Sequence, residues 1–130
     1  MNFLRHFLLA ALAFTVLDLI WLGILARRIY ERYLGHHMRP QTDWLAAILF
    51  YFIFLAGLVY FVVLPAAGLP ARKVLLNGAF FGAVAYSTYE LTNRAVLKDW
   101  PWEIVLIDIA WGALLCSIVA WVSWHFGGQR

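Results

Sequence analysis

The chain has little of what a water-soluble or disulfide-stabilised protein needs. It contains one cysteine, Cys116, which excludes an intrachain disulfide and a cysteine-based metal cluster. Charged residues make up only 13% of the 130 residues, whereas hydrophobic residues make up 65%. A soluble domain of this length keeps a polar surface over a modest core, so this composition excludes an ordinary soluble fold. We therefore expect one transmembrane domain over residues 1–130.

Histidine is scarce as well, which limits the chemistry available to the chain. Four histidines are too few for the histidine-rich di-iron sites of membrane desaturases, and no Ser-His or Cys-His catalytic arrangement is recognisable. The adjacent pair His36-His37 lacks further spaced ligands, so it predicts a solvated loop and no metal site. The net charge of +3 comes from basic residues at the ends of apolar runs, which is typical of membrane flanks and excludes a nucleic-acid partner. No cofactor can be named from these residues.

Four apolar runs are each long enough to cross a hydrocarbon layer of about 30 Å. They predict helical spans at about residues 3–26, 44–64, 73–94 and 102–124, and thus an all-α integral membrane four-helix bundle. Residues 27–34 continue the first run as an amphipathic helix that Gly35 can end. Because the first span and this continuation together are too long for the bilayer, the continuation must project into water or bend along the interface.

An even number of spans places both termini on the same side of the bilayer. We expect a bacterial inner membrane protein whose loops opposite the termini face the cytoplasm, because those loops carry six Lys and Arg residues against four on the side of the termini. The six are Arg27, Arg28, Arg32, Arg39, Arg94 and Lys98, and the four are Arg5, Arg72, Lys73 and Arg130.

The polar residues of the spans gather in the leaflet opposite the termini. Asp18 and Asp108 lie at similar depths, and each is followed one helical turn later by a tryptophan, Trp21 or Trp111, on the same helix face. On the third span Tyr86 begins a polar stripe at i, i+4 and i+7. The residues that we predict to line one ligand-binding pocket are Asp18, Trp21, Tyr86, Glu90, Asn93, Asp108 and Trp111.

A pocket of this composition suits a cation. An ionised carboxylate facing lipid is costly, so Asp18, Glu90 and Asp108 are expected to face the bundle, where repulsion would leave a proton shared unless a cation neutralises them. Carboxylates and aromatic faces together stabilise ammonium groups. The alternative is structural: the aspartates bridge helices through hydrogen bonds to Tyr, Thr, Asn or Trp, or pair with Arg94 or Lys98.

These motifs carry a family resemblance along nearly the whole chain. They read Asp18-x-x-Trp21-Leu-Gly23, then Tyr89-Glu90-Leu-Thr92-Asn93 with Lys98-Asp-Trp100-Pro101, and Asp108-x-x-Trp111-Gly112. The chain resembles a family of small four-helix bacterial predicted membrane proteins that is classed as a domain of unknown function. Glu90 departs from the aspartate that this family usually carries there. The resemblance implies the four-helix architecture and no particular activity.

Three functions remain open. The first is binding or transport of a small cation, an organic amine or a lipid headgroup between the first, third and fourth spans. The second is a lipid-modifying membrane enzyme in which three carboxylates and Asn93 act in acid–base chemistry or hold a divalent ion. The third is a structural or accessory subunit. Membrane lipids are expected partners, and Gly78-x-x-x-Gly82 allows close approach of a helix from a second copy.

Overall fold

The computed structural model describes residues 2–35 and 43–128, and within these ranges the chain is helical and contains no strand. Five α-helices follow one another: α1 (Phe3–Ile20), α2 (Arg27–Leu34), α3 (Trp44–Leu58), α4 (Ala71–Val96) and α5 (Trp102–Gly127). A π-helical segment, Trp21–Leu25, extends α1, and a second, Val59–Val63, extends α3 into a short 3₁₀ turn at Leu64–Ala66. The all-α prediction is confirmed, although the described residues form five α-helices and not four.

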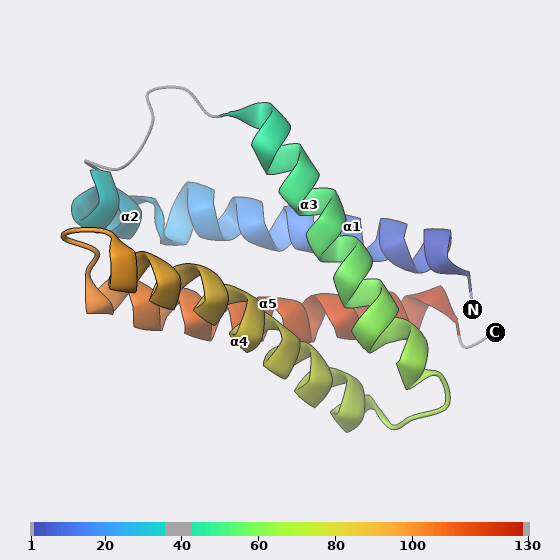
Figure 1. The fold of residues 1–130 in the computed structure, drawn as a ribbon. Helices are drawn as coiled ribbons and strands as arrows, with labels where there is room; N and C mark the ends of the chain where they lie inside the picture. Colours follow the sequence, from blue (N-terminus) through green and yellow to red (C-terminus); the bar gives the residue numbers. More distant parts are fainter. Residues whose placement is uncertain (1, 36–42, 129–130) are drawn as a thin grey trace.

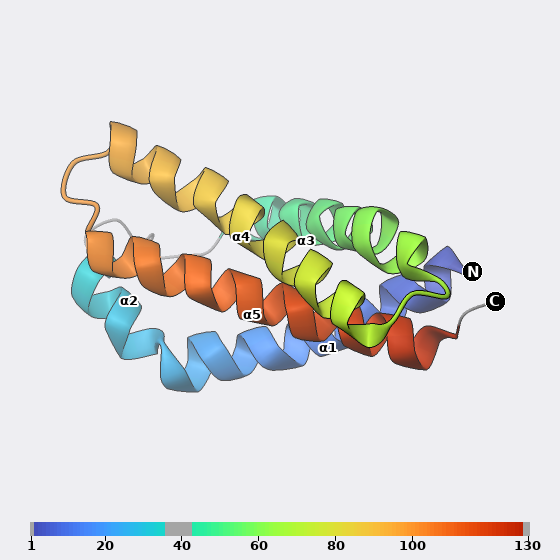
Figure 2. The same ribbon diagram turned by 90° about the horizontal axis from the view of Figure 1, so that it is seen from below.

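The five helices form an elongated bundle whose termini meet at one end (Figures 1 and 2). α1 and α5 run antiparallel side by side, and α4 and α5 form the most extensive helix pair as an antiparallel hairpin. α3 crosses α1 obliquely, so that only its C-terminal half and the following π-helical segment enter the core. The N-terminal half of α3 is therefore separated from the rest of the bundle.

The fifth helix arises because the first span does not continue as one straight rod. The prediction of an amphipathic helix that ends at Gly35 is confirmed, since α2 covers residues 27–34 and Gly35 caps it. Between α1 and α2 lie the π-helical segment and Ala26, and α2 then turns steeply away from α1 (Figure 2). The apolar face of α2, including Tyr30 and Leu34, packs against Trp100 and Ile104 at the start of α5. The continuation thus bends away from the first span, and its course along the membrane interface stays a prediction.

Among the residues that the structure describes, three helical segments are long and apolar enough to cross a membrane: Phe3–Leu25, Trp44–Ala66 and Trp102–Gly127. At 26 residues α4 is long enough, but the polar residues of its C-terminal part lower its hydropathy. The structure therefore supports a membrane protein with three apolar spanning helices. That α4 forms a fourth span remains a prediction.

Small residues bring α4 and α5 close together. A Cβ at Gly78 would lie 2.8 Å from the Cys116 carbonyl oxygen, and a Cβ at Gly82 would overlap the Gly112 carbonyl. Both α4 glycines are therefore covered by α5 of the same chain. The predicted homo-oligomer is untested, and with these two glycines covered by α5 it would require a further surface.

The two chain ends are tied together by buried polar contacts. The His6 ring lies fully buried with Nδ1 2.7 Å from the Asn2 carbonyl oxygen and Nε2 3.0 Å from the Gly128 carbonyl oxygen. The Ser123 hydroxyl donates to the backbone carbonyl of His6 over 2.7 Å. Since Ser123 bonds the backbone and not the imidazole, this pair is structural and is not a nucleophile with its base.

Candidate functional site

The two aspartates of the spans lie near one another across the α1–α5 contact. Asp108 is 6% exposed and Asp18 is half-buried, and the two carboxyl groups lie within electrostatic range of each other. Tyr86 of α4 is also close enough to Asp18 for an electrostatic interaction. Antiparallel packing of α1 and α5 places residues at matched depth side by side, which is why the spacing of the two motifs brings these carboxylates together.

Each of the two tryptophans is directed toward the aspartate of the other motif and not toward the aspartate of its own helix. Trp111, one turn after Asp108, directs its indole N–H toward Asp18 on the other helix. Trp21, one turn after Asp18, donates its N–H over 3.2 Å to the hydroxyl of Tyr30, which in turn donates to Oδ1 of Asp108. The two indole rings stack with centroids 4.5 Å apart and an interplanar angle of 9°. Trp111 thus lies next to the aspartate of the other helix, and Trp21 is linked to Asp108 through the Tyr30 hydroxyl.

One of these two contacts is incomplete. Although the Trp111 N–H faces the Asp18 carboxylate, it does not meet hydrogen-bond geometry and is a buried donor without a partner among the described residues. A buried N–H without an acceptor costs about 1–3 kcal/mol. The Asp18 side of the site is therefore less completely satisfied than the Asp108 side.

Tyr30 is a site residue that the sequence analysis did not select. It lies on the buried face of α2, and the turn between α1 and α2 carries its hydroxyl to Asp108. The available signal was weak: a tyrosine among apolar residues of a short amphipathic helix is equally typical of packing. Only the direction of the bend shows that this face meets α5.

Tyr86 reaches the site because α5 carries a glycine opposite its ring. A Cβ at Gly112 would overlap the Tyr86 ring and side-chain Cβ, so only a glycine lets the ring lie this close to the α5 backbone. Gly23 is the glycine of the matching motif on the first span, and a Cβ there would meet no atom of the described residues within 4 Å. The two motifs are alike in sequence, but only the glycine of α5 shapes the site.

Glu90 lies apart from the two aspartates. Its side chain is fully buried, and Oε2 accepts a hydrogen bond of 2.7 Å from the indole N–H of Trp100. Its other oxygen, Oε1, has no hydrogen-bond partner among the described residues. Asn93, one turn further along α4, has its side chain beside Tyr89. Glu90 and Asn93 thus belong to the α4–α5 connection, whereas Asp18, Trp21, Tyr86, Asp108 and Trp111 gather together.

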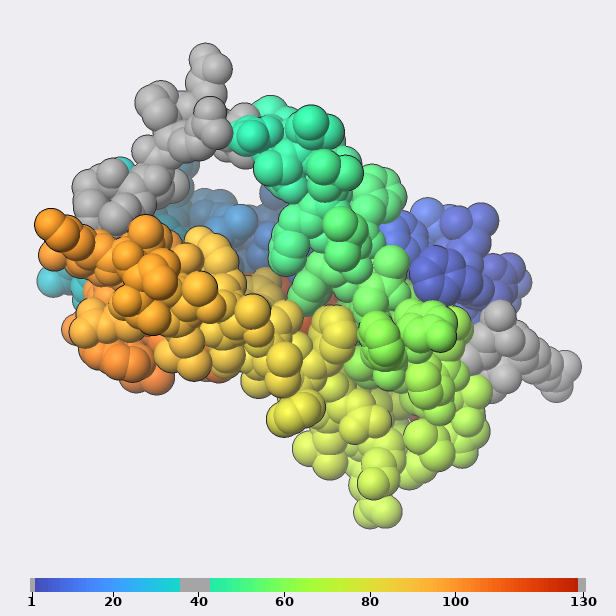
Figure 3. Space-filling view, viewed as in Figure 1, coloured from blue at the N-terminus to red at the C-terminus, as the bar shows by residue number. Residues whose placement is uncertain are grey.

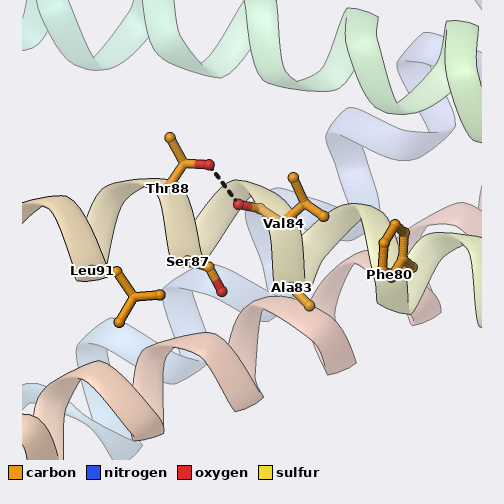
Figure 4. A pocket seen from close by; sticks show the side chains of 6 residues that line it. All are labelled: Phe80, Ala83, Val84, Ser87, Thr88 and Leu91. Carbon is orange, nitrogen blue, oxygen red and sulfur yellow. Dashed lines mark hydrogen bonds between the residues drawn. The ribbon is translucent and has the colours of Figure 1, made fainter.

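Two cavities adjoin the aspartates. One of about 260 Å³ reaches Asp108 between α3, α4 and α5, and one of about 720 Å³ reaches Asp18 between α1 and α3. Phe50 and Tyr86 line both, so the two cavities are neighbours. By contrast, the shallow groove of about 450 Å³ on the outer face of α4, from Phe80 to Leu91, has no ionisable lining residue, and its Thr88 hydroxyl bonds the Val84 carbonyl of its own helix over 2.8 Å (Figure 4).

The charge of the aspartates is not balanced by a basic side chain. Within the described ranges neither Asp18 nor Asp108 forms an ion pair, and Arg94 instead donates to the Trp100 carbonyl over 2.7 Å and stacks over Trp102. The described residues contain no group of three His, Cys, Asp or Glu side chains placed to hold a metal ion. His36 and His37 lie outside the described residues. The site therefore presents unpaired carboxylates beside aromatic rings.

Comparison with known proteins gives a family but no assigned activity. No curated protein and no solved structure matches the chain. A family described as a predicted membrane protein (DUF2177) matches residues 3–125, which is nearly the whole chain. This agrees with the resemblance seen in the motifs and with the apolar helices of the structure. The chain therefore belongs to the DUF2177 family of predicted membrane proteins.

Proposed function

We propose that this protein binds the ammonium group of an organic amine or lipid headgroup between α1, α4 and α5, with Asp18 and Asp108 as its counter-ions. The observation that carries the proposal is the pair of neighbouring carboxylates without an ion-pair partner among the described residues. Ionised carboxylates at membrane depth are costly unless they are paired, and two that repel one another are costlier still. A bound cation removes both penalties at once.

The aromatic residues favour an ammonium group over a bare metal ion. The phenol ring of Tyr86 lines both cavities beside the aspartates, and an aromatic face attracts an organic cation by about 0.5–2 kcal/mol. The stacked indoles of Trp21 and Trp111 add aromatic surface next to the two carboxylates. A divalent ion would instead require several oxygen ligands converging on one point. Glu90, which was to supply a third carboxylate, is bonded to Trp100 outside this group, which weakens the proposal of a metal-dependent enzyme.

The cavities provide room for such a ligand. Volumes of about 260 and 720 Å³ bracket much of the usual range of small-molecule sites, and each cavity is bordered by one of the two aspartates. We place the protein in the bacterial inner membrane with four spans, α4 being the fourth. In that arrangement the site lies within the leaflet opposite the termini.

Binding can be tested with ethylammonium chloride on the full chain purified in a nonionic maltoside detergent. Calorimetric titration of the wild type should give a saturable isotherm, and Asp18→Asn and Asp108→Asn should each lower the affinity at least about tenfold, because each removes one counter-ion. Glu103→Gln is the matched control, since Glu103 is an exposed acid in the first turn of α5. It should leave the affinity within twofold of the wild-type value. Absence of saturable binding to the wild type, or equal binding by the asparagine variants, would overturn the proposal.

A further inference from the structure

The larger cavity is a cleft between α1 and the N-terminal half of α3. Its walls are mainly apolar, and many of them are exposed: Leu19 is 67% and Trp44 is 70% exposed. Figure 3 shows the molecular surface hollowed beside the N-terminal half of α3. The lining residues include Leu19, Leu22, Trp44, Ala47, Ile48 and Phe50. Since both helices are apolar enough to span the membrane, these walls face the hydrocarbon layer.

Hydrogen bonds between the two helices close one end of the cleft. The Tyr51 hydroxyl of α3 donates to the Ala11 carbonyl of α1 over 2.8 Å and also bonds the Thr15 hydroxyl. From this junction the helices diverge toward Trp44, and α3 residues 44–50 are exposed. The cleft is thus a wedge that is closed at Tyr51 and open along the side of the bundle.

The wall of this wedge carries one acidic residue, Asp18. Among the described lining residues Asp18 is the sole ionisable group with a charged form at neutral pH, and Tyr86 lies beside it. Water is a poor occupant of an apolar wedge at hydrocarbon depth, whereas a hydrocarbon chain matches its apolar walls. The Asp18 carboxylate in turn selects an occupant that carries a positive charge.

We infer that the ligand is a long-chain ammonium amphiphile that enters sideways from the bilayer, with its hydrocarbon chain between α1 and α3 and its ammonium group at Asp18. This inference rests on the proposed ammonium site and adds the class of ligand and its route. The cleft supplies a continuous path from the bilayer to Asp18, and Tyr86, shared by both cavities, marks where the head of the ligand passes toward Asp108.

The chain-binding part of the inference can be tested separately from the ammonium site. Ala47 lines the cleft, whereas its neighbour Ala46 is exposed and is not among the lining residues. Ala47→Phe fills the wedge, and Ala46→Phe adds the same group beside it. We expect Ala47→Phe to lower the affinity for dodecylammonium at least about tenfold while its affinity for ethylammonium stays within twofold. Ala46→Phe should change neither affinity more than twofold.

Different outcomes separate the two proposals. If neither amine binds the wild type, the ammonium site itself fails. If both amines bind but Ala47→Phe leaves dodecylammonium binding unchanged, or weakens both amines equally, the cleft does not hold the chain and the inference fails alone. Neutral dodecanol competing as well as dodecylammonium would show that the charge is not selected, which also overturns the inference.

A labelling experiment on the wild type avoids dependence on a substituted cleft. A dodecylammonium analogue with a photoreactive diazirine in its chain should label peptides of α1, its π-helical extension and α3, including Leu22 and Ile48, and excess dodecylammonium should suppress the labelling. Labelling confined to the outer face of α4, around Phe80 and Leu91, would indicate general lipid contact and would contradict the inference.

Discussion

The indole rings of Trp21 and Trp111 stack with centroids 4.5 Å apart. The N–H of Trp111 points toward Asp18, and the N–H of Trp21 donates to Tyr30, which in turn bonds Asp108. This stack joins the end of the first span to the middle of α5. Because Trp21 lies in the π-helical segment, its ring direction depends on the local widening of the helix. π-Helical turns recur at functional sites. Here the π-helical segment holds Trp21 in its stack with Trp111, next to both aspartates.

The two tryptophans should differ in how much they contribute to stability. Phenylalanine at either position keeps an aromatic ring but removes the N–H. Trp21→Phe breaks a hydrogen bond to Tyr30, whereas Trp111→Phe removes a donor that has no acceptor in hydrogen-bond geometry among the described residues. We expect Trp21→Phe to be less stable than Trp111→Phe by about 1 kcal/mol in unfolding experiments in detergent. Equal loss in both variants would contradict the assigned hydrogen bonds.

Tyr30 should stabilise the buried carboxylate of Asp108. Tyr30→Phe leaves that oxygen without its donor, so we expect a loss of about 1–3 kcal/mol. The half-buried Tyr33 of the same helix is the control, and Tyr33→Phe should cost less than about 1 kcal/mol. Combining Tyr30→Phe with Asp108→Asn should cost less than the sum of the single variants, because both act on one contact. Additive losses would show that Tyr30 acts elsewhere.

The glycines of the two matching motifs should respond in opposite ways to alanine. Gly112→Ala places a methyl group into the Tyr86 ring, so we expect a loss of about 1–3 kcal/mol from overpacking and a displaced Tyr86. Gly23→Ala meets open space among the described residues and should be neutral or stabilising by up to about 1 kcal/mol. Thermal unfolding of both variants distinguishes them. A tolerated Gly112→Ala would argue against the close approach of α4 to α5.

The Glu90–Trp100 contact should be separable from ligand binding. Trp100→Phe removes the donor to a fully buried carboxyl group and should cost about 1–3 kcal/mol, whereas Glu90→Gln keeps an acceptor and should cost less. Both variants, where folded, should retain ethylammonium affinity within about threefold. A much larger loss of binding in Glu90→Gln would place Glu90 in the ammonium site after all.

Topology gives an independent test of the fourth span. If α4 crosses the membrane, both termini lie on one side, and the loop after α4 lies on the other. Single cysteines at Leu69 and Lys98, which flank α4, in a Cys116→Ala background should then react with a membrane-impermeant maleimide from opposite sides. Labelling from the same side would contradict four spans.

Much of the fold was predictable from local sequence. Apolar runs set the length and position of the helices, because a chain in lipid must satisfy its backbone hydrogen bonds within each span. The depth of Asp18 and Asp108 followed from counting residues along those spans, and their approach followed from antiparallel packing. The amphipathic pattern of residues 27–34 likewise specified a helix with one apolar face.

Tertiary structure decided which groups meet. Spacing along a helix places Trp111 near Asp108 and Glu90 near Tyr86, but it does not state which neighbour each side chain contacts. That depends on the rotation of each helix about its axis and on the bend after Trp21–Leu25. These features arise from packing across helices, so only the folded chain shows Trp111 facing Asp18, Tyr30 bonded to Asp108 and Glu90 held by Trp100.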